Sequence, residues 1–253
     1  MIPDGTSWFM VFARIGALLF SFPLFSSQNI PVKVRLGLAA VAACLISPLL
    51  PPLPSPISSW QIILLLFGEI LIGLCFGFVC RMIFFAIEVA GGIIATETGL
   101  MLSAAFNPLS SAGESAASVL LHWLAIILFF TLDLHHWLLV AFQKSYLILP
   151  VGGVAAGEAL LTDVLSKSSA IFSVAVQMVA PVITASFAVT LLFSLLARAV
   201  PQMNAFSESF AARIVAGLAV FGMGLTLMAQ HICNYLARIP SDLLKAAELL
   251  HLN

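Results

Sequence analysis

Five charged residues lie within or between apolar stretches of the sequence, where charge needs a physical reason. They are Arg14, Glu69, Arg81, Glu88 and Glu97. A charged side chain that faces lipid at mid-bilayer costs roughly 3 kcal/mol, so these groups must pair, face protein or face water. Arg81 and Glu88 are two helical turns apart and therefore share one helix face. Two interpretations stay open: an ion or substrate path, and pairing between helices or subunits, which we favour.

A second polar group, Asp133, His135 and His136, could suggest a metal site. Two adjacent histidines do not share a face of a helix, and no H-E-x-x-H pattern or suitably spaced carboxylate follows them. An interfacial cluster beside Trp137 is the plainer interpretation. No Ser/His/Asp or Cys/His arrangement offers a nucleophile for catalysis. The sequence thus predicts no catalytic, metal-binding or cofactor-binding residue, and a protein that is not an enzyme.

The composition places these polar groups in a very apolar chain. Of the 253 residues, 62% are hydrophobic and 8% are charged, whereas a soluble domain carries roughly 25% charged residues. A chain this short cannot bury so much apolar surface within itself, so its natural surroundings are lipid or a large apolar assembly. The net charge of −1 offers no basic face for nucleic acid. The four cysteines lie in apolar runs without a C-x-x-C pair, which favours small hydrophobic side chains over a disulfide or zinc framework.

Long apolar runs separated by short polar breaks make up most of the chain. They are typical of membrane helices, because every backbone group in lipid must bond internally, and they are too continuous for a β-barrel. We therefore expect an all-α integral membrane protein with about six to seven long apolar helices and no soluble domain. The expected helices cover about 8–25, 36–48, 60–87, a fourth stretch from Gly91-Gly92 to Phe106, 116–149, 169–200 and 206–236.

Three local features refine these expected helices. Pro181 lies near the middle of the sixth helix and is expected to kink it. Gly73 and Gly77 allow a second helix to approach closely, although glycines are common in membrane helices. A short amphipathic tail over 241–250 closes the chain, with Ser241 as its expected N-cap.

The segment 103–118 differs in character from the helices around it. It is rich in small residues and nearly uncharged, with two larger apolar side chains at Phe106 and Leu109. A simple connector explains this composition, and from the residues alone we favour a connector. A loop that fills a pore would need the same chemistry, because small residues let it move while the two apolar side chains exclude water and ions.

At several places the sequence resembles the FliR family, which comprises the flagellar biosynthetic export-gate protein and its T-type counterparts in virulence type III secretion. The resemblance covers nearly the whole chain, and the order and spacing of the motifs are more specific than any single motif. The Phe-Asn-Pro and Pro-Gln-Met-Asn stretches are more similar to the flagellar branch. The motifs run from Arg14 to Ser21, Ile30 to Ala39, Gly73 to Arg81, Glu88 to Ile94, Glu97 to Leu100, Phe106 to Pro108, Leu134 to Leu139, Ala180 to Ile183 and Arg198 to Phe206.

The resemblance implies a non-enzymatic, pore-forming subunit of the flagellar type III protein export gate, required for export of flagellar subunits and for flagellum assembly. The alternatives are a T-type subunit of a virulence type III secretion system and an ion or small-molecule transporter, which the intramembrane charges suggest but no inverted repeat supports. The implied partners are P-type and Q-type gate subunits, the B-type export switch protein, unfolded flagellar export substrates and the membrane, in a hetero-oligomer without nucleic acid. The implied location is the bacterial inner membrane at the flagellar basal body.

The resemblance also implies a division of the chain and a role for one loop. A single export-gate domain over 1–253 would contain a P-like helical part over 1–150, a Q-like helical hairpin over 165–240 and the amphipathic tail over 241–253. In the family, the loop after the fourth apolar segment plugs the channel. That loop corresponds here to Phe106, Asn107, Pro108, Leu109, Ser110 and Ser111.

Overall fold

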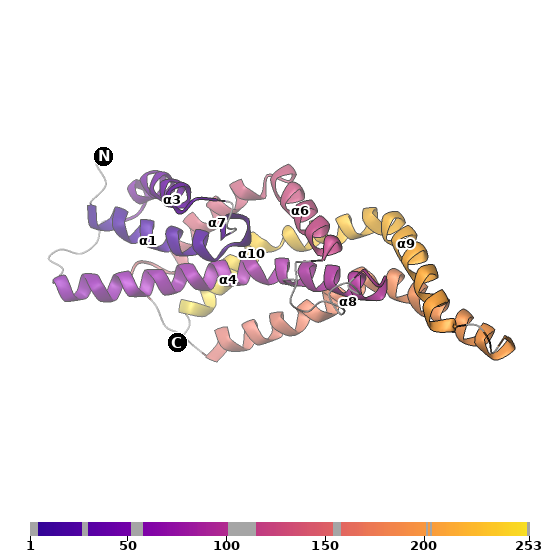
Figure 1. Cartoon of the computed structure of the whole chain (residues 1–253). Coiled ribbons are helices and arrows are strands. Elements are labelled where there is room, and N and C mark those ends of the chain that lie inside the picture. The colour runs from indigo at the N-terminus through magenta and orange to yellow at the C-terminus, as the bar shows by residue number, and fades with distance from the viewer. Residues whose placement is uncertain are drawn as a thin grey trace. The chain divides into compact units, whose positions relative to one another are not determined.

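The computed structural model describes residues 5–26, 30–51, 58–100, 115–153, 158–200, 202 and 204–251. These residues form helices and connecting turns, with no strand among them (Figure 1). In chain order the elements are α1 (Gly5–Ser21), α2 (Pro23–Ser26), α3 (Val32–Ile46), the 3-10 turn η1 (Ser47–Leu49), α4 (Ser59–Glu97), α6 (Ala116–Thr131), α7 (Leu134–Ile148), α8 (Glu158–Ala199), α9 (Ala205–Leu236) and α10 (Ile239–His251). The predicted all-α fold is confirmed.

Within the described part of the chain, four helical stretches are long and apolar enough to cross a membrane. They are Val32–Leu49, Ser59–Glu97, Glu158–Ala199 and Ser207–His251, and α6 with α7 would make a fifth if this pair counts as one span. Between 17% and 33% of the most apolar window of each is buried within the chain. Because lipid or other protein must cover the remaining apolar surface, the chain is a membrane protein.

The chain divides into two compact units. The first unit comprises Met1–Ile83, Asp133–Ser168 and Ala237–Asn253, and within it α1 packs on α3 while α7 packs on α10. The second unit comprises Phe84–Leu132 and Ser169–Leu236, and within it α6 packs on α9. Each unit thus joins segments that are distant in sequence.

The third and fourth expected helices are one helix, which corrects the predicted break at Gly91-Gly92. Helix α4 runs unbroken for 39 residues and ends at Glu97. A Cβ at Gly91 would overlap the backbone of Ser118 on α6, so this glycine serves close contact between helices rather than a break. Just beyond the helix, Gly99 has a φ of 76°, a left-handed conformation that glycine adopts without strain.

The fifth expected helix is instead two helices, α6 and α7, separated by a short break. Asp133 lies in this break with a φ of 52°, in the left-handed region that few residues other than glycine adopt. The apolar run is continuous on both sides of the break, so hydrophobicity alone gave no sign of where one helix ends and the next begins.

The later helices begin earlier than expected. Helix α8 starts at Glu158, well before the expected start at Ser169, and continues through Pro181 to Ala199. Helix α10 starts at Ile239, so the prediction of Ser241 as its N-cap is wrong. The Ser241 hydroxyl donates instead to the Arg238 carbonyl at 2.8 Å, as a serine in the first turn of a helix can do.

Candidate functional site

Arg14 on α1 and Glu69 on α4 form an ion pair in the core of the first unit. The guanidinium Nε and Nη2 donate to the two carboxylate oxygens of Glu69 at 2.5 and 2.9 Å. Both side chains have 0% exposure. A two-pronged contact between a planar guanidinium and a carboxylate is among the strongest ion-pair geometries. The structure therefore joins two of the five intramembrane charges that the sequence singled out.

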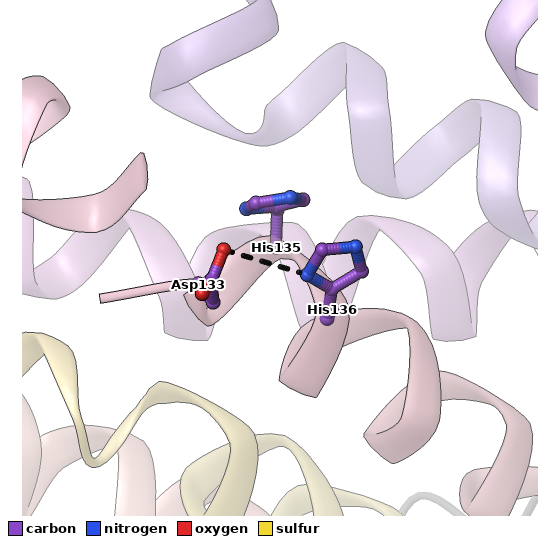
Figure 2. A group of neighbouring side chains, drawn as sticks. All are labelled: Asp133, His135 and His136. Carbon is purple, nitrogen blue, oxygen red and sulfur yellow. Dashed lines mark ion pairs between the residues drawn. The ribbon is translucent and has the colours of Figure 1, made fainter. Parts of the chain in front are cut away.

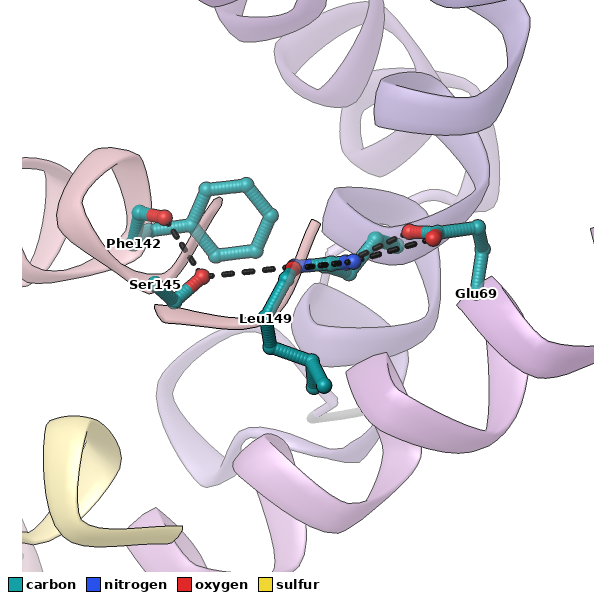
Figure 3. Close-up of polar contacts among 5 residues, drawn as sticks. Glu69, Phe142, Ser145 and Leu149 are labelled. Atoms are coloured by element: carbon teal, nitrogen blue, oxygen red, sulfur yellow. Dashed lines mark hydrogen bonds and ion pairs between the residues drawn. The ribbon is translucent and has the colours of Figure 1, made fainter. Parts of the chain in front are cut away.

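The end of α7 completes the surroundings of Arg14 (Figure 3). Nη1 and Nη2 donate to the Leu149 carbonyl at 3.3 and 3.2 Å, and Nη1 also donates to Ser145 Oγ at 3.5 Å. The Ser145 hydroxyl in turn donates to the Phe142 carbonyl at 2.7 Å. The guanidinium carbon lies 3.8 Å from the centre of the Tyr146 ring, a cation–π contact. Arg14 thus binds a helix-end carbonyl that the helix itself cannot satisfy, and it links α1, α4 and α7.

Two glycines on α4 let α1 come close enough for this pair to form. A Cβ at Gly73 would overlap the backbone carbonyl of Arg14 and would lie 2.7 Å from Ala17 Cβ. A Cβ at Gly77 would lie 2.6 Å from Ser21 Cβ. Because Gly73 is one turn after Glu69, the closest approach of the two helices falls beside the ion pair.

The remaining three intramembrane charges lie on α4 and are only partly buried: Arg81, Glu88 and Glu97. In the second unit, Glu88 Oε1 lies 3.8 Å from His122 Nδ1 on α6, and 42% of the Glu88 side chain is exposed. The backbone carbonyl of Glu97 accepts a hydrogen bond from Ser186 Oγ on α8 at 3.0 Å. The five charges thus comprise one fully buried pair and three groups that remain partly accessible from outside the described chain.

Residues of α9 pack against the turn that follows α4. A Cβ at Gly99 would lie 2.5 Å from the Phe210 ring, so the ring rests directly on the glycine. A Cβ at Gly217 would likewise lie 2.5 Å from Thr98 Cγ2. The Thr98 hydroxyl donates to the Ile94 carbonyl at 2.7 Å, which ties the turn back to the helix. The turn that follows α4 is therefore anchored on α9 through Thr98 and Gly99.

The helix that follows the predicted plug begins with a capped turn beside α4. Ser115 is the N-cap of α6, and its Oγ accepts a hydrogen bond from the backbone N of Ser118 at 3.0 Å. Ser115 Oγ also donates to the Gly91 carbonyl at 3.3 Å. The predicted plug itself, 106–111, lies outside the described residues. Both helix ends that flank it are anchored within the second unit.

Comparison with known proteins identifies the family. The sequence matches the family described as "Bacterial export proteins, family 1" over residues 6–239. This chain belongs to that family. It is 27% identical to the flagellar biosynthetic protein FliR of Escherichia coli K12, over 96% of this chain and 94% of the relative. It is 32% identical to the protein of the same name from Caulobacter vibrioides, over 87% and 89%, and 30% identical to that from Bacillus subtilis, over 79% and 78%.

This member of the export family also has a charged network that the sequence reasoning missed. In the first unit, Lys167 Nζ lies 3.2 Å from Asp163 Oδ2 and 2.9 Å from Asp242 Oδ1. Lys245 Nζ donates to Asp163 Oδ1 at 2.6 Å, and only 10% of the Asp163 side chain is exposed. The network ties α10 to the start of α8. Its signal in the sequence was the i, i+4 spacing of Asp163 and Lys167, which is typical of a helix, although the expected sixth helix began only at 169.

Asp133, His135 and His136 gather at the start of α7 (Figure 2). One potential ligand atom from each residue lies within 4.8 Å of the others. His136 Nδ1 lies 3.6 Å from Asp133 Oδ1, and the centres of the two imidazole rings are 4.0 Å apart. The sequence argument separated the two histidines because adjacent side chains diverge within a helix. Here they occupy the first turn, directly after a left-handed Asp133, and all three side chains converge.

Proposed function

We propose that this chain is a non-enzymatic, pore-forming subunit of the flagellar type III protein export gate, required for export of flagellar subunits and for flagellum assembly. The observation that carries the proposal is the export-family match over 6–239, joined by relatives named flagellar biosynthetic protein FliR that align over most of both chains. The proposed location is the bacterial inner membrane at the flagellar basal body.

Exposed apolar surface supports a role inside a larger assembly. On the first half of α4, the side chains of Trp60, Ile63 and Phe67 are 67%, 57% and 61% exposed. Such a surface needs lipid or other protein against it. The proposed neighbours are P-type and Q-type gate subunits and the B-type export switch protein, in a hetero-oligomer that passes unfolded flagellar export substrates.

The proposed plug of this pore is the loop formed by Phe106, Asn107, Pro108, Leu109, Ser110 and Ser111. Its composition supports this role, because small residues permit movement and two apolar side chains exclude water. Firm anchorage of the flanking helix ends, at Gly99 and at the Ser115 cap, supports it further. A plug must be fixed at both ends if it is to return to the same closed position after substrate has passed.

The intramembrane charges have two proposed roles in the gate. The Arg14–Glu69 pair would hold helices together within the chain, while Arg81, Glu88 and Glu97 would contact neighbouring subunits through their accessible portions. The proposed division into a P-like part over 1–150, a Q-like hairpin over 165–240 and a tail over 241–253 assigns α8 and α9 to the hairpin, with a kink at Pro181 in α8.

Deletion of the gene in the native host tests the proposal. Loss of flagella and of secreted hook and filament proteins, restored by the wild-type gene, is the expected result. Normal motility with a separate secretion defect would move the chain to the virulence branch, and normal motility with normal secretion would overturn the export role.

The plug has its own test, a chain that lacks 106–111. In the deletion strain, this variant should make the membrane permeable to small hydrophilic dyes, because the pore can no longer close. A matched variant replaces the same six residues with Gly and Ser of equal length, which keeps the tether but removes both apolar side chains. An impermeable membrane with both variants, at normal protein level, would contradict the plug assignment.

A further inference from the structure

We propose that Asp133, His135 and His136 form a binding site for one divalent transition metal ion of the zinc class. The site does not depend on the export role, and it would exist in the chain whatever the chain transports. Two imidazole nitrogens and one carboxylate oxygen are a donor set that suits Zn²⁺, Co²⁺, Ni²⁺ or Fe²⁺, whereas Mg²⁺ and Ca²⁺ prefer oxygen ligands alone. Three protein ligands leave a fourth position open for water or another ligand.

The shortest distance in the cluster already fits a metal ion. Zinc binds imidazole nitrogen and carboxylate oxygen at about 2.0–2.2 Å, so two such ligands at a tetrahedral angle lie about 3.4 Å apart. His136 Nδ1 and Asp133 Oδ1 are 3.6 Å apart. An ion between these two atoms would therefore meet both of them with little movement of either side chain.

The third ligand needs a small adjustment. Potential ligand atoms of the three residues lie within 4.8 Å of one another, whereas two atoms bound to the same zinc ion at a tetrahedral angle lie about 3.4 Å apart. The nitrogen of His135 must therefore move by up to about 1.4 Å. Rotation about its side-chain bonds is the movement required, and the ring is not fully buried and lies beside His136 with their centres 4.0 Å apart.

The backbone of Asp133 is the second reason to infer a site here. This residue has a φ of 52° although it has a side chain, and such conformations gather at binding sites. It also stands at the N-cap of α7 without making the side-chain hydrogen bond that aspartate usually makes there. Its carboxylate is directed at His136 instead (Figure 2). The alternative explanation is an ion pair with protonated His136, but about 70% of each side chain is exposed, so that pair would contribute little.

Metal binding would clasp the start of α7. The ion would join Asp133, which precedes the helix, to two residues of the first helical turn. It would thereby stabilise a helix start that has no side-chain capping hydrogen bond. Because binding favours the folded chain over the unfolded one, saturating metal should raise the melting temperature of the protein.

Cobalt is the probe of choice for the test, since Co²⁺ replaces Zn²⁺ and absorbs visible light when it is bound by nitrogen and oxygen ligands at low coordination number. The full chain is purified in mild detergent, together with any subunits that remain bound, and is stripped of metal with a chelator. It is then titrated with Co²⁺, and Zn²⁺ is added at the end to displace the bound Co²⁺. The expected result is one Co²⁺ per chain with a visible absorption band, micromolar or tighter affinity, and displacement by Zn²⁺.

Two ligand variants and one control test the assignment. His136→Gln and Asp133→Asn should each weaken binding by at least about 100-fold, because loss of mere outer-shell partners already weakens metal sites by 10–100-fold. Asn tolerates the left-handed backbone, so Asp133→Asn keeps the fold. The control, His231→Gln with His251→Gln, removes two histidines outside the cluster and should leave binding unchanged. Millimolar affinity, or equal binding by wild type and by both ligand variants with unchanged helical circular dichroism, would overturn the proposal.

Discussion

Glu69→Gln should destabilise the chain by about 3–5 kcal/mol, because it leaves the Arg14 guanidinium buried without its counter-charge. The structure supports a value near the lower end of this range. Both side chains are fully buried, so water cannot take the place of the lost carboxylate. The two contacts at 2.5 and 2.9 Å lose their charge. The Leu149 carbonyl and the Tyr146 ring keep their contacts with the cation, and these reduce the penalty.

Removal of both charges should be tolerated better than removal of one. Buried ion pairs replaced by apolar residues of similar volume are often neutral or more stable. In Arg14→Met with Glu69→Leu, the remaining deficit is the Leu149 carbonyl, which loses its donor at a cost of about 1–3 kcal/mol. We therefore expect the double variant to be more stable than Arg14→Met alone, which leaves a buried anion.

Unfolding by SDS titration in mild detergent, followed by helical circular dichroism, measures these differences. Glu248→Gln on α10 is the matched control, because Glu248 is exposed and the same change there should alter stability by no more than about 0.5 kcal/mol. The reasoning is refuted if Glu69→Gln lies within about 1 kcal/mol of wild type, a value below the range for a broken buried pair. A double variant less stable than both single variants would refute it as well.

Three further outcomes are expected from single contacts. Gly91→Ala should lower the melting temperature, because the new methyl group overlaps the Ser118 backbone. Gly92→Ala is the control: its Cβ would lie in open space, so this change should be neutral or stabilising by up to about 1 kcal/mol. Equal melting curves for the two variants would contradict this. Ser115→Ala should destabilise α6 by about 1 kcal/mol, as thermal melting would show. Ser115→Asp should restore the cap but not the hydrogen bond to the Gly91 carbonyl, which a carboxylate cannot donate. Asp163→Asn should speed proteolysis at the C-terminus, because α10 loses the Lys245 contact and keeps only the Lys167–Asp242 ion pair to α8, and high salt should shrink the difference from wild type.

The helical membrane character of the chain could be predicted because it depends on composition and length alone. The course of the chain at Gly91-Gly92 and at Asp133 could not be predicted, because these residues act through contacts. Gly91-Gly92 resembles a helix break, yet α4 continues there and Ser118 packs on Gly91. Asp133 resembles a polar residue at an interface, yet its left-handed backbone divides an apolar run in two. Whether a glycine or an aspartate interrupts a helix therefore depends on the residues that it contacts in the folded chain.

The sequence identified the charged residues of the candidate site but not which of them pair. Arg14 and Glu69 are conspicuous because charge is rare in this chain, but 55 positions separate them, and which charges pair depends on which helices meet. The Leu149 carbonyl has no sequence signature at all, since every residue has one. The network around Asp163 was missed for another reason: Asp163 precedes the expected start of the sixth helix, and its partner Lys245 lies 82 positions away in the amphipathic tail.

Three polar links among the described residues join segments far apart in the sequence: Arg14 to Glu69, Ser186 to Glu97, and Lys245 to Asp163. In lipid, apolar side chains are covered equally well by lipid tails and by other helices, so hydrophobicity alone does not decide which helices meet or at what height. Gly73 allows α1 and α4 to approach, and the Arg14–Glu69 pair fixes their register. A slip of one helical turn, about 5.4 Å, would part the two charges and leave both in apolar surroundings. The Arg14–Glu69 pair would then serve specificity of packing more than stability. The predicted tolerance of the double apolar variant tests that interpretation.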